Sequence, residues 1–138
     1  MLAFCRAEYG TVHLWRGQWT QAEAMLEASV EDFTRSRPAM VGRPLACLAE
    51  LRRRQARADE AAHLLDRAGP SAAAQLCRTR LALDEGESRR AVELVERLLP
   101  QTPAERILER APALELLVRA RVARGELEEA RAAHESLR

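Results

Sequence analysis

Apolar residues recur at three- and four-residue spacing along most of this chain, which is the period of amphipathic helices. In the first segment Phe4, Ala7, Thr11, Leu14 and Trp15 carry this spacing. Together with caps and helix breakers, the spacing predicts eight long helices. Their expected ranges are 2–16, 20–34, 44–55, 59–68, 71–85, 88–99, 112–125 and 126–137.

Polar residues and a proline mark several of the expected helix starts. Thr20 forms a capping-box pattern with Glu23, and Thr, Pro and Glu within 102–105 predict a short extra helix. The expected caps and first residues are Thr20, Ser71, Ser88 and Pro112. These residues locate the predicted helix starts to within a residue or two, which periodicity alone does not do.

A six-residue phrase recurs four times, at 17–22, 56–61, 86–91 and 125–130. It opens with Gly, or with Ala in the second copy, and closes with Ala. Each copy ends one helical pattern and begins another, so each is read as the turn of a helical hairpin. The sequence therefore predicts an all-α fold, a right-handed α-solenoid in one domain of 138 residues. The expected hairpins are about 1–35, 43–69, 71–100 and 112–138.

A second level of order appears when the first half of the chain is laid on the second half so that Gly17 meets Gly86. The same alignment places Arg52 on Arg121. Other residues coincide in the same way: Ala22 and Ala91, Glu27 and Glu96, Leu45 and Leu114, Leu48 and Leu117, Glu60 and Glu129, Ala61 and Ala130. We therefore expect an internal repeat, two copies of a four-helix unit, with proline-rich segments at 35–43 and 101–111.

Composition supports helices and excludes several functions. All 22 basic residues are Arg, Lys and Asn are absent, and Ala, Leu, Arg and Glu favour helix. The net charge of +1 gives no global field for nucleic acid or an anionic membrane. No apolar run approaches the ~20 residues of a membrane span. The solitary Cys5, Cys47 and Cys77 suggest buried thiols in a reducing cytoplasm.

The recurring phrase resembles the hairpin turn of tetratricopeptide repeats, in which a Gly, a large residue and an Ala build the turn. Gly17-Trp19-Ala22 and Gly125-Leu127-Ala130 carry this resemblance well. The Arg-rich and Ala-rich phrases at 48–54 and 109–117 resemble the helical-repeat region of actinobacterial LuxR-type transcriptional regulators. The resemblance implies a regulatory repeat region without its DNA-binding helix-turn-helix, because this chain contains no such motif and no phosphate-binding loop.

No catalytic site, metal site or cofactor is expected. His13, His63 and His134 lie on different predicted helices, far from one another in sequence. A catalytic or metal site would need convergence with acids or thiols. The serines at 71 and 88 are interpreted as helix caps, and the paired acids 59–60 and 128–129 as first-turn residues that favour the helix dipole.

The resemblance also implies that the first helix of each hairpin lines a concave groove. The transferred positions are Thr11, Leu14, Trp15, Glu50, Arg53, Arg54, Arg80, Leu83, Asp84, Arg119, Val122 and Ala123. The candidate binding residues among them are Trp15, Glu50, Arg53, Arg54, Arg80, Asp84 and Arg119. A row of Arg53, Arg80 and Arg119 would suit a carboxylate or phosphate. The alternative for the run 52–54 is a solvated face, because its side chains point in directions about 100° apart.

The leading hypothesis is a non-enzymatic interaction domain that binds another protein, another segment of its own chain, or a second copy. The alternatives are a small-molecule sensor that uses the groove, and a stand-alone tetratricopeptide adaptor. Met1 and Leu2 enter directly into an apolar helix, so we expect a fragment of a longer array. Its uncovered terminal faces are expected to form a homodimer. Direct binding to nucleic acid or to a membrane is not expected.

Overall fold

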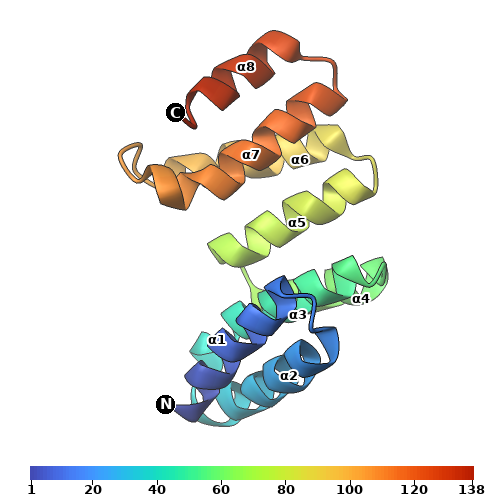
Figure 1. The fold of residues 1–138 in the computed structure, drawn as a ribbon, viewed down its shortest axis with the longest axis vertical. Coiled ribbons are helices and arrows are strands. Elements are labelled where there is room, and N and C mark those ends of the chain that lie inside the picture. The colour runs from blue at the N-terminus through green and yellow to red at the C-terminus, as the bar shows by residue number, and fades with distance from the viewer. The chain divides into compact units, whose positions relative to one another are not determined.

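The computed structural model describes residues 1–138 and contains helices without any strand, which confirms the all-helical prediction (Figure 1). The α-helices are α1 (Leu2–Trp15), α2 (Trp19–Ser36), α3 (Gly42–Arg54), α4 (Ala58–Ala68), α5 (Ala72–Asp84), α6 (Ser88–Leu98), α7 (Ile107–Ala123) and α8 (Leu127–Glu135). Two short 3₁₀ helices, Pro38–Met40 and Leu99–Gln101, follow α2 and α6. The chain divides into two units, Met1–Cys77 and Arg78–Arg138, and the boundary falls inside α5.

In the first unit, α1 packs along α2, α3 packs against α2, and α4 packs against α3. Figure 1 shows these helices as antiparallel neighbours. Their shared core is apolar and fully buried, as helix faces with three- and four-residue periodicity require. Its central residues are Leu14, Ala22, Leu26, Leu48 and Leu51.

In the second unit, α6 packs against α7, and α7 packs against α8. The core combines the C-terminal part of α5 with α6 and α7. It consists of Ala82, Ala91, Val92, Leu94 and Ala120, with Leu83 and Leu117 packed against it. Alanine at three of these positions allows the helix backbones to approach closely.

The four turns predicted from the recurring phrase share one backbone geometry. Each contains one residue with positive φ: Gly17 at 75°, Ala56 at 59°, Gly86 at 77° and Gly125 at 76°. After each, a backbone N–H donates to a carbonyl five positions earlier, over 2.8–3.0 Å. The bonds are Gln18 to His13, Arg57 to Arg52, Glu87 to Ala82 and Glu126 to Arg121. This is the Schellman arrangement, which ends a helix and satisfies its last carbonyls.

The closing alanine of each phrase lies where two helices meet. Ala22, Ala61 and Ala91 are 0% exposed, and Ala130 is 5% exposed. In α1, Gly10 allows an even closer approach, since a Cβ there would lie 2.8 Å from Cγ of Leu26. The predicted role of small residues in the hairpins is therefore visible at each of these positions.

Two of the predicted serine and threonine caps are wrong. Helix α2 begins at Trp19 after Gln18, and α6 begins at Ser88 after Glu87, in both cases without a side-chain cap bond. Thr20 and Ser88 already lie inside these helices, so their side chains do not stand at the N-cap position. Ser71 does cap α5, because its Oγ accepts a bond of 3.2 Å from the N–H of Ala74.

The predicted start of the seventh helix is also wrong. Helix α7 begins at Ile107 and includes Pro112, while the segment 102–105 forms no helix. A proline inside a helix removes one bond to the carbonyl four positions earlier. Here that carbonyl belongs to Leu108 in the exposed first turns, where water can satisfy it. The next turn then buries Ala113, Leu114 and Leu116, which holds the helix together.

Candidate functional site

A groove of about 820 Å³ runs between α2 and α4 in the first unit. Leu45 and Leu48 of α3 form its base, and Val30 and Leu64 lie on its two walls. Charged and polar residues surround this apolar strip. They are Glu27, Glu31, Thr34 and Arg35 from α2, Arg52 from α3, and Asp59, Glu60, His63 and Arg67 from α4.

Arg52 joins the three helices that form the groove. Its side chain is only 8% exposed and forms ion pairs with Glu23, with Glu27 at 3.3 Å and with Glu60 at 3.4 Å. Its Nη1 also donates to Gln55 over 3.0 Å. A guanidinium carries five donors in a planar fork, so one side chain can hold several carboxylates. The sequence interpretation of a solvated face is wrong for Arg52, because carboxylates from both neighbouring helices surround it.

These ion pairs also fix the direction of the groove. Arg52 lies in the last turn of α3, whereas Glu27 lies in the first half of α2 and Glu60 in the first turn of α4. Both α2 and α4 therefore start beside the same end of α3 and run back along it. The two walls of the groove are parallel helices.

The two ends of the groove carry opposite charges. Glu27, Asp59 and Glu60 form the acidic end, beside Arg52, whereas Arg35 and Arg67 form the basic end. Asp59 and Arg67 are exposed and take part in no ion pair. Part of the charge at each end is therefore available to a ligand.

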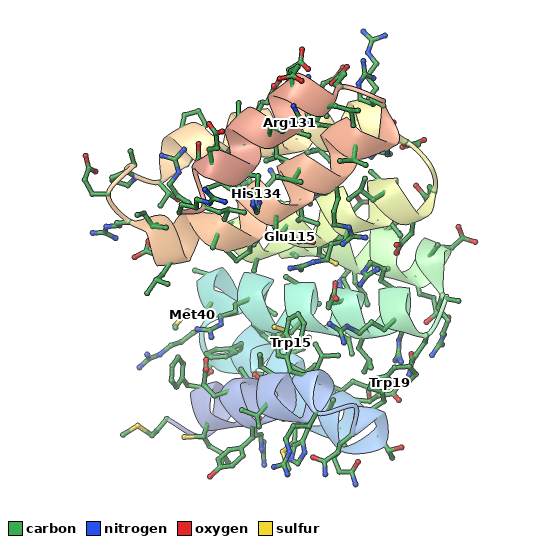
Figure 2. The ribbon with its side chains drawn as sticks, turned by 45° about the horizontal axis from the view of Figure 1, so that its top comes forward. Trp15, Trp19, Met40, Glu115, Arg131 and His134 are labelled. Atoms are coloured by element: carbon green, nitrogen blue, oxygen red, sulfur yellow. The ribbon has the colours of Figure 1, made fainter.

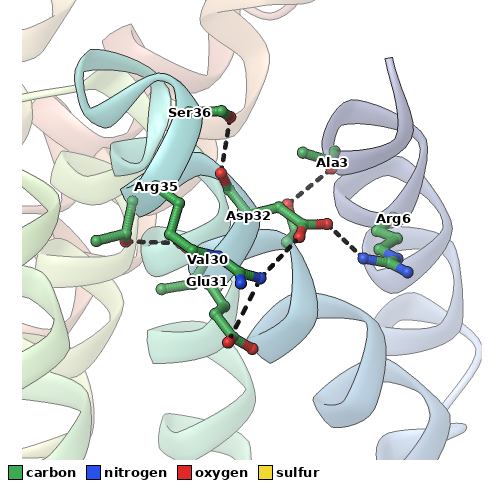
Figure 3. A network of polar contacts seen from close by, with 9 residues as sticks. Ala3, Arg6, Val30, Glu31, Asp32, Arg35 and Ser36 are labelled. Carbon is green, nitrogen blue, oxygen red and sulfur yellow. Dashed lines mark hydrogen bonds and ion pairs between the residues drawn. The ribbon is translucent and has the colours of Figure 1, made fainter.

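Arg35 is held in place at the basic end by two acids on its own helix. Its Nη2 lies 3.4 Å from carboxylate oxygens of both Glu31 and Asp32. Asp32 also forms an ion pair with Arg6 of α1, as Figure 3 shows. The basic end is therefore tied to α1 through a chain of alternating charges.

Four of the predicted binding residues come together at the C-terminal ends of α1 and α3. The Glu50 carboxylate accepts from Nε and Nη2 of Arg53 at 3.0 and 2.9 Å, and from Nε of Arg54 at 2.9 Å. The Arg54 guanidinium lies 4.3 Å from the ring centroid of Trp15. Figure 2 shows Trp15 directed toward this side of α3. Trp15 is 56% exposed, so a ligand can reach it.

The groove-facing positions transferred from the resemblance are not all accessible. The Glu50 side chain is only 5% exposed, and Leu14 is buried in the core. Glu50 is buried because its two arginines cover it, and Leu14 because α2 packs on that side of α1. Both residues support the helix pair and do not face a ligand directly.

The other three candidate residues belong to the second unit. Arg80 and Asp84 lie on α5, and Arg119 on α7 forms an exposed ion pair of 3.5 Å with Glu115. Arg53 lies in the first unit. Because Arg53 belongs to one unit and Arg80 and Arg119 to the other, the row of these three arginines stays a prediction.

The thiols occupy separate environments. Cys77 is buried as expected, Cys47 is half-buried, and Cys5 is exposed, so the expectation of three buried thiols is wrong for Cys5. Burial raises the pKa of the Cys47 thiol, although a hydrogen bond from Thr11 opposes the shift. No group of three His, Cys, Asp or Glu side chains is placed to hold a metal ion.

Each histidine has a different setting. His13 Nδ1 lies 2.7 Å from the amide oxygen of Gln18, and His134 is exposed on α8. His63 lines the groove midway along α4. It is the only one of the three that lies in the candidate site.

Sequence reasoning missed the groove because it looked to the first helix of each hairpin. The groove lies between α2 and α4, which are the second helices of the first two hairpins. One signal did point to it: the internal repeat matches both Arg52 with Arg121 and Glu27 with Glu96. An acid and an arginine thus stand at the same separation in both halves of the chain, which indicates that the two residues are in contact in each half.

Comparison of the chain with protein-family models and with curated proteins gave no match. None of the eight helices has the length and the apolar character that crossing a membrane requires.

Proposed function

We propose that this chain is a non-enzymatic protein-interaction domain, a set of tetratricopeptide-like hairpins serving as the regulatory repeat region of a LuxR-type transcriptional regulator. Its binding surface is the groove between α2 and α4. The observation that carries the proposal is the groove itself, an apolar strip of Val30, Leu45, Leu48 and Leu64 bordered by charged side chains on both walls. The family part rests on the sequence resemblance.

The arrangement of charges favours an elongated partner. Along α2 the groove residues Glu27, Glu31 and Arg35 are spaced by one helical turn. Along α4 Glu60, His63 and Arg67 repeat at nearly the same interval. A partner with side chains at turn spacing can meet each of these in register, which is the usual mode of recognition of a helix in a groove.

Selection of helical peptides from a random display library on the purified chain tests the proposal. We expect binders that lose their affinity when Leu64, in the middle of the α4 wall, is replaced by Arg. Ala62→Arg is the matched control, because Ala62 is exposed on α4 and does not line the groove. Selected peptides that tolerate Leu64→Arg, or a library without binders, would contradict the proposal.

A small-molecule effector is the second candidate, and one observation favours it. The volume of about 820 Å³ lies within the range of roughly 300–1,000 Å³ that is typical of ligand sites. Arg35, His63 and Arg67 would suit a carboxylate. A panel of small carboxylates should then raise the melting temperature of the parent chain but not of Arg67→Ala.

A further inference from the structure

We infer that the occupant of the groove is an amphipathic helix, acidic in its first turns and basic in its last turns, lying antiparallel to α2 and α4. The inference rests on the proposed function and specifies the partner of the same site. Three features lead to it: the order of charges, the direction of the walls, and the length of the apolar strip.

The order of charges sets the polarity of the partner. The acidic end contains Glu27, Asp59 and Glu60. Arg52 pairs with Glu27 and Glu60, and Arg57 also pairs with Glu60 at 2.6 Å, so Asp59 is the acid without a counterion. At the basic end, Arg67 has no acidic partner. A ligand that places cations beside Asp59 and anions beside Arg67 gains attraction at both ends.

The direction of the walls then decides how a helix meets this requirement. The acidic end lies where α4 starts and where α2 is in its first half, so the positive ends of both helix dipoles point that way. A third helix placed antiparallel brings its C-terminus, the negative end of its own dipole, to this end. Basic residues in the last turns of that helix satisfy the dipole and the acidic end together.

The groove limits the contact to a short helix. Asp59 and Arg67 are eight positions apart on α4, which corresponds to about 12 Å of helix rise. The occupant therefore contributes two or three apolar residues, one turn apart, over Leu45, Leu48 and Leu64. Its charged residues lie beyond this apolar stretch at either end.

Two designed peptides of about 18 residues test the polarity. Both carry the same leucine stripe and the same composition, but one has Glu in its first turns and Arg in its last, and the other has the reverse order. Binding is measured by fluorescence anisotropy on the full chain. We expect the first peptide to bind about tenfold more tightly, with the preference shrinking as salt is raised.

A charge-swapped variant gives the decisive comparison. Asp59→Arg combined with Arg67→Glu reverses both ends while leaving the ion pairs of Arg52 intact, because neither residue forms an ion pair. Circular dichroism checks that the variant keeps its fold. The peptide preference should then invert or disappear, whereas Ala62→Arg, at an exposed position of α4 that does not line the groove, should leave it unchanged.

The outcomes separate this inference from the proposed function. Equal binding of the two peptides, lost in Leu64→Arg, would overturn the polarity but keep the groove as a protein-binding site. Failure of both peptides while selected library peptides still bind through Leu64 would overturn the helical occupant. A preference for the first peptide that survives the charge swap would also contradict the inference.

Discussion

The two halves of this chain share an arginine cluster but differ in what surrounds it. In the first unit Arg52 pairs with Glu27, and in the second unit Arg121 pairs with Glu96, at matching positions of the internal repeat. Both arginines lie at the end of a helix whose neighbours they tie together. The Arg52 side chain is 8% exposed, whereas that of Arg121 is 21% exposed.

The groove residues are shared only in part: the acidic end recurs as Glu96, Glu128 and Glu129, but the basic end does not recur. At the positions that correspond to His63, Leu64 and Arg67, the second unit has Ala132, Ala133 and Ser136. The positions that correspond to Glu31, Thr34 and Arg35 are filled by Pro100, Pro103 and Ala104, where α6 has already ended. The second unit therefore lacks the basic end of the groove and the C-terminal part of the α2 wall.

This difference distinguishes the residues that hold the helices together from the residues that form the binding groove. A cluster present in both units is explained by its contacts to the neighbouring helix and turn, and needs no ligand. The basic end, with Arg35, His63 and Arg67, occurs in the first unit alone, so the repeat architecture does not require it. We therefore assign the binding role to the groove residues and a structural role to Arg52 and Arg121.

The largest expected effect is the loss of Arg52. Arg52→Ala leaves the carboxylates of Glu23, Glu27 and Glu60 close together without their shared counterion, and should destabilise the chain by about 2–3 kcal/mol. Arg121→Ala should cost about 1 kcal/mol, because its pairs are more exposed. Denaturant unfolding followed by circular dichroism measures both. Equal losses would show that the two clusters do not differ in strength.

The next effect concerns the contact between α1 and α2. A Cβ at Gly10 would lie 2.8 Å from Cγ of Leu26, so Gly10→Ala should cost about 1–2 kcal/mol despite the better helix propensity of Ala. In the second unit Thr79 stands at the position of Gly10 and Val95 at the position of Leu26. The residue opposite the larger Thr is therefore smaller than Leu.

A double-mutant cycle sharpens this comparison. Leu26→Ala removes the Cγ and Cδ2 atoms that clash with the new methyl group, so Gly10→Ala should cost much less in that background. Additive effects of the two substitutions would show that the close approach does not limit the first unit.

A smaller effect is expected at the turns. Ala56 adopts φ of 59°, a conformation that favours glycine, while the corresponding Gly125 has φ of 76°. Ala56→Gly should therefore stabilise the chain by about 0.5–1 kcal/mol, and Gly125→Ala should destabilise it by about 1 kcal/mol. Thermal unfolding checks the opposite signs. A loss in both variants would mean that the turn at Ala56 is not strained.

Local chemistry made much of this fold predictable from the sequence. Positive φ at Gly17, Gly86 and Gly125 follows from the residue type, and the recurring phrase located all four turns. The start of α7 was missed because a proline at 112 is tolerated on an exposed helix face.

The site depended on contacts between distant residues, which local patterns do not determine. Burial of Arg52 requires acids from α2 and α4, and burial of Glu50 requires two arginines around it. Helical periodicity could not predict the groove, because the groove depends on the distance between α2 and α4 in the folded chain. Only the paired matches of the internal repeat could have indicated the Arg52 contact.

The smallest expected effect is a dependence on pH at Glu126, a position that holds no acid in the first unit. Hydrogen bonds from Arg121 and then from Arg124 lower the pKa of Glu126 from its ordinary value of 4.5, whereas the corresponding residue of the first unit is Arg57. A lowered pKa in the folded state means that the ionised form stabilises the fold. This contribution is present above about pH 4.5 and is lost as pH falls through the lowered value.

Glu126→Gln should therefore be less stable than the parent at pH 7, and the difference should vanish in acid. In an Arg121→Gln background the loss at pH 7 should shrink, since the main partner of the carboxylate is gone. A difference that stays constant from pH 7 to pH 3 would assign the effect of Glu126 to packing and not to its charge.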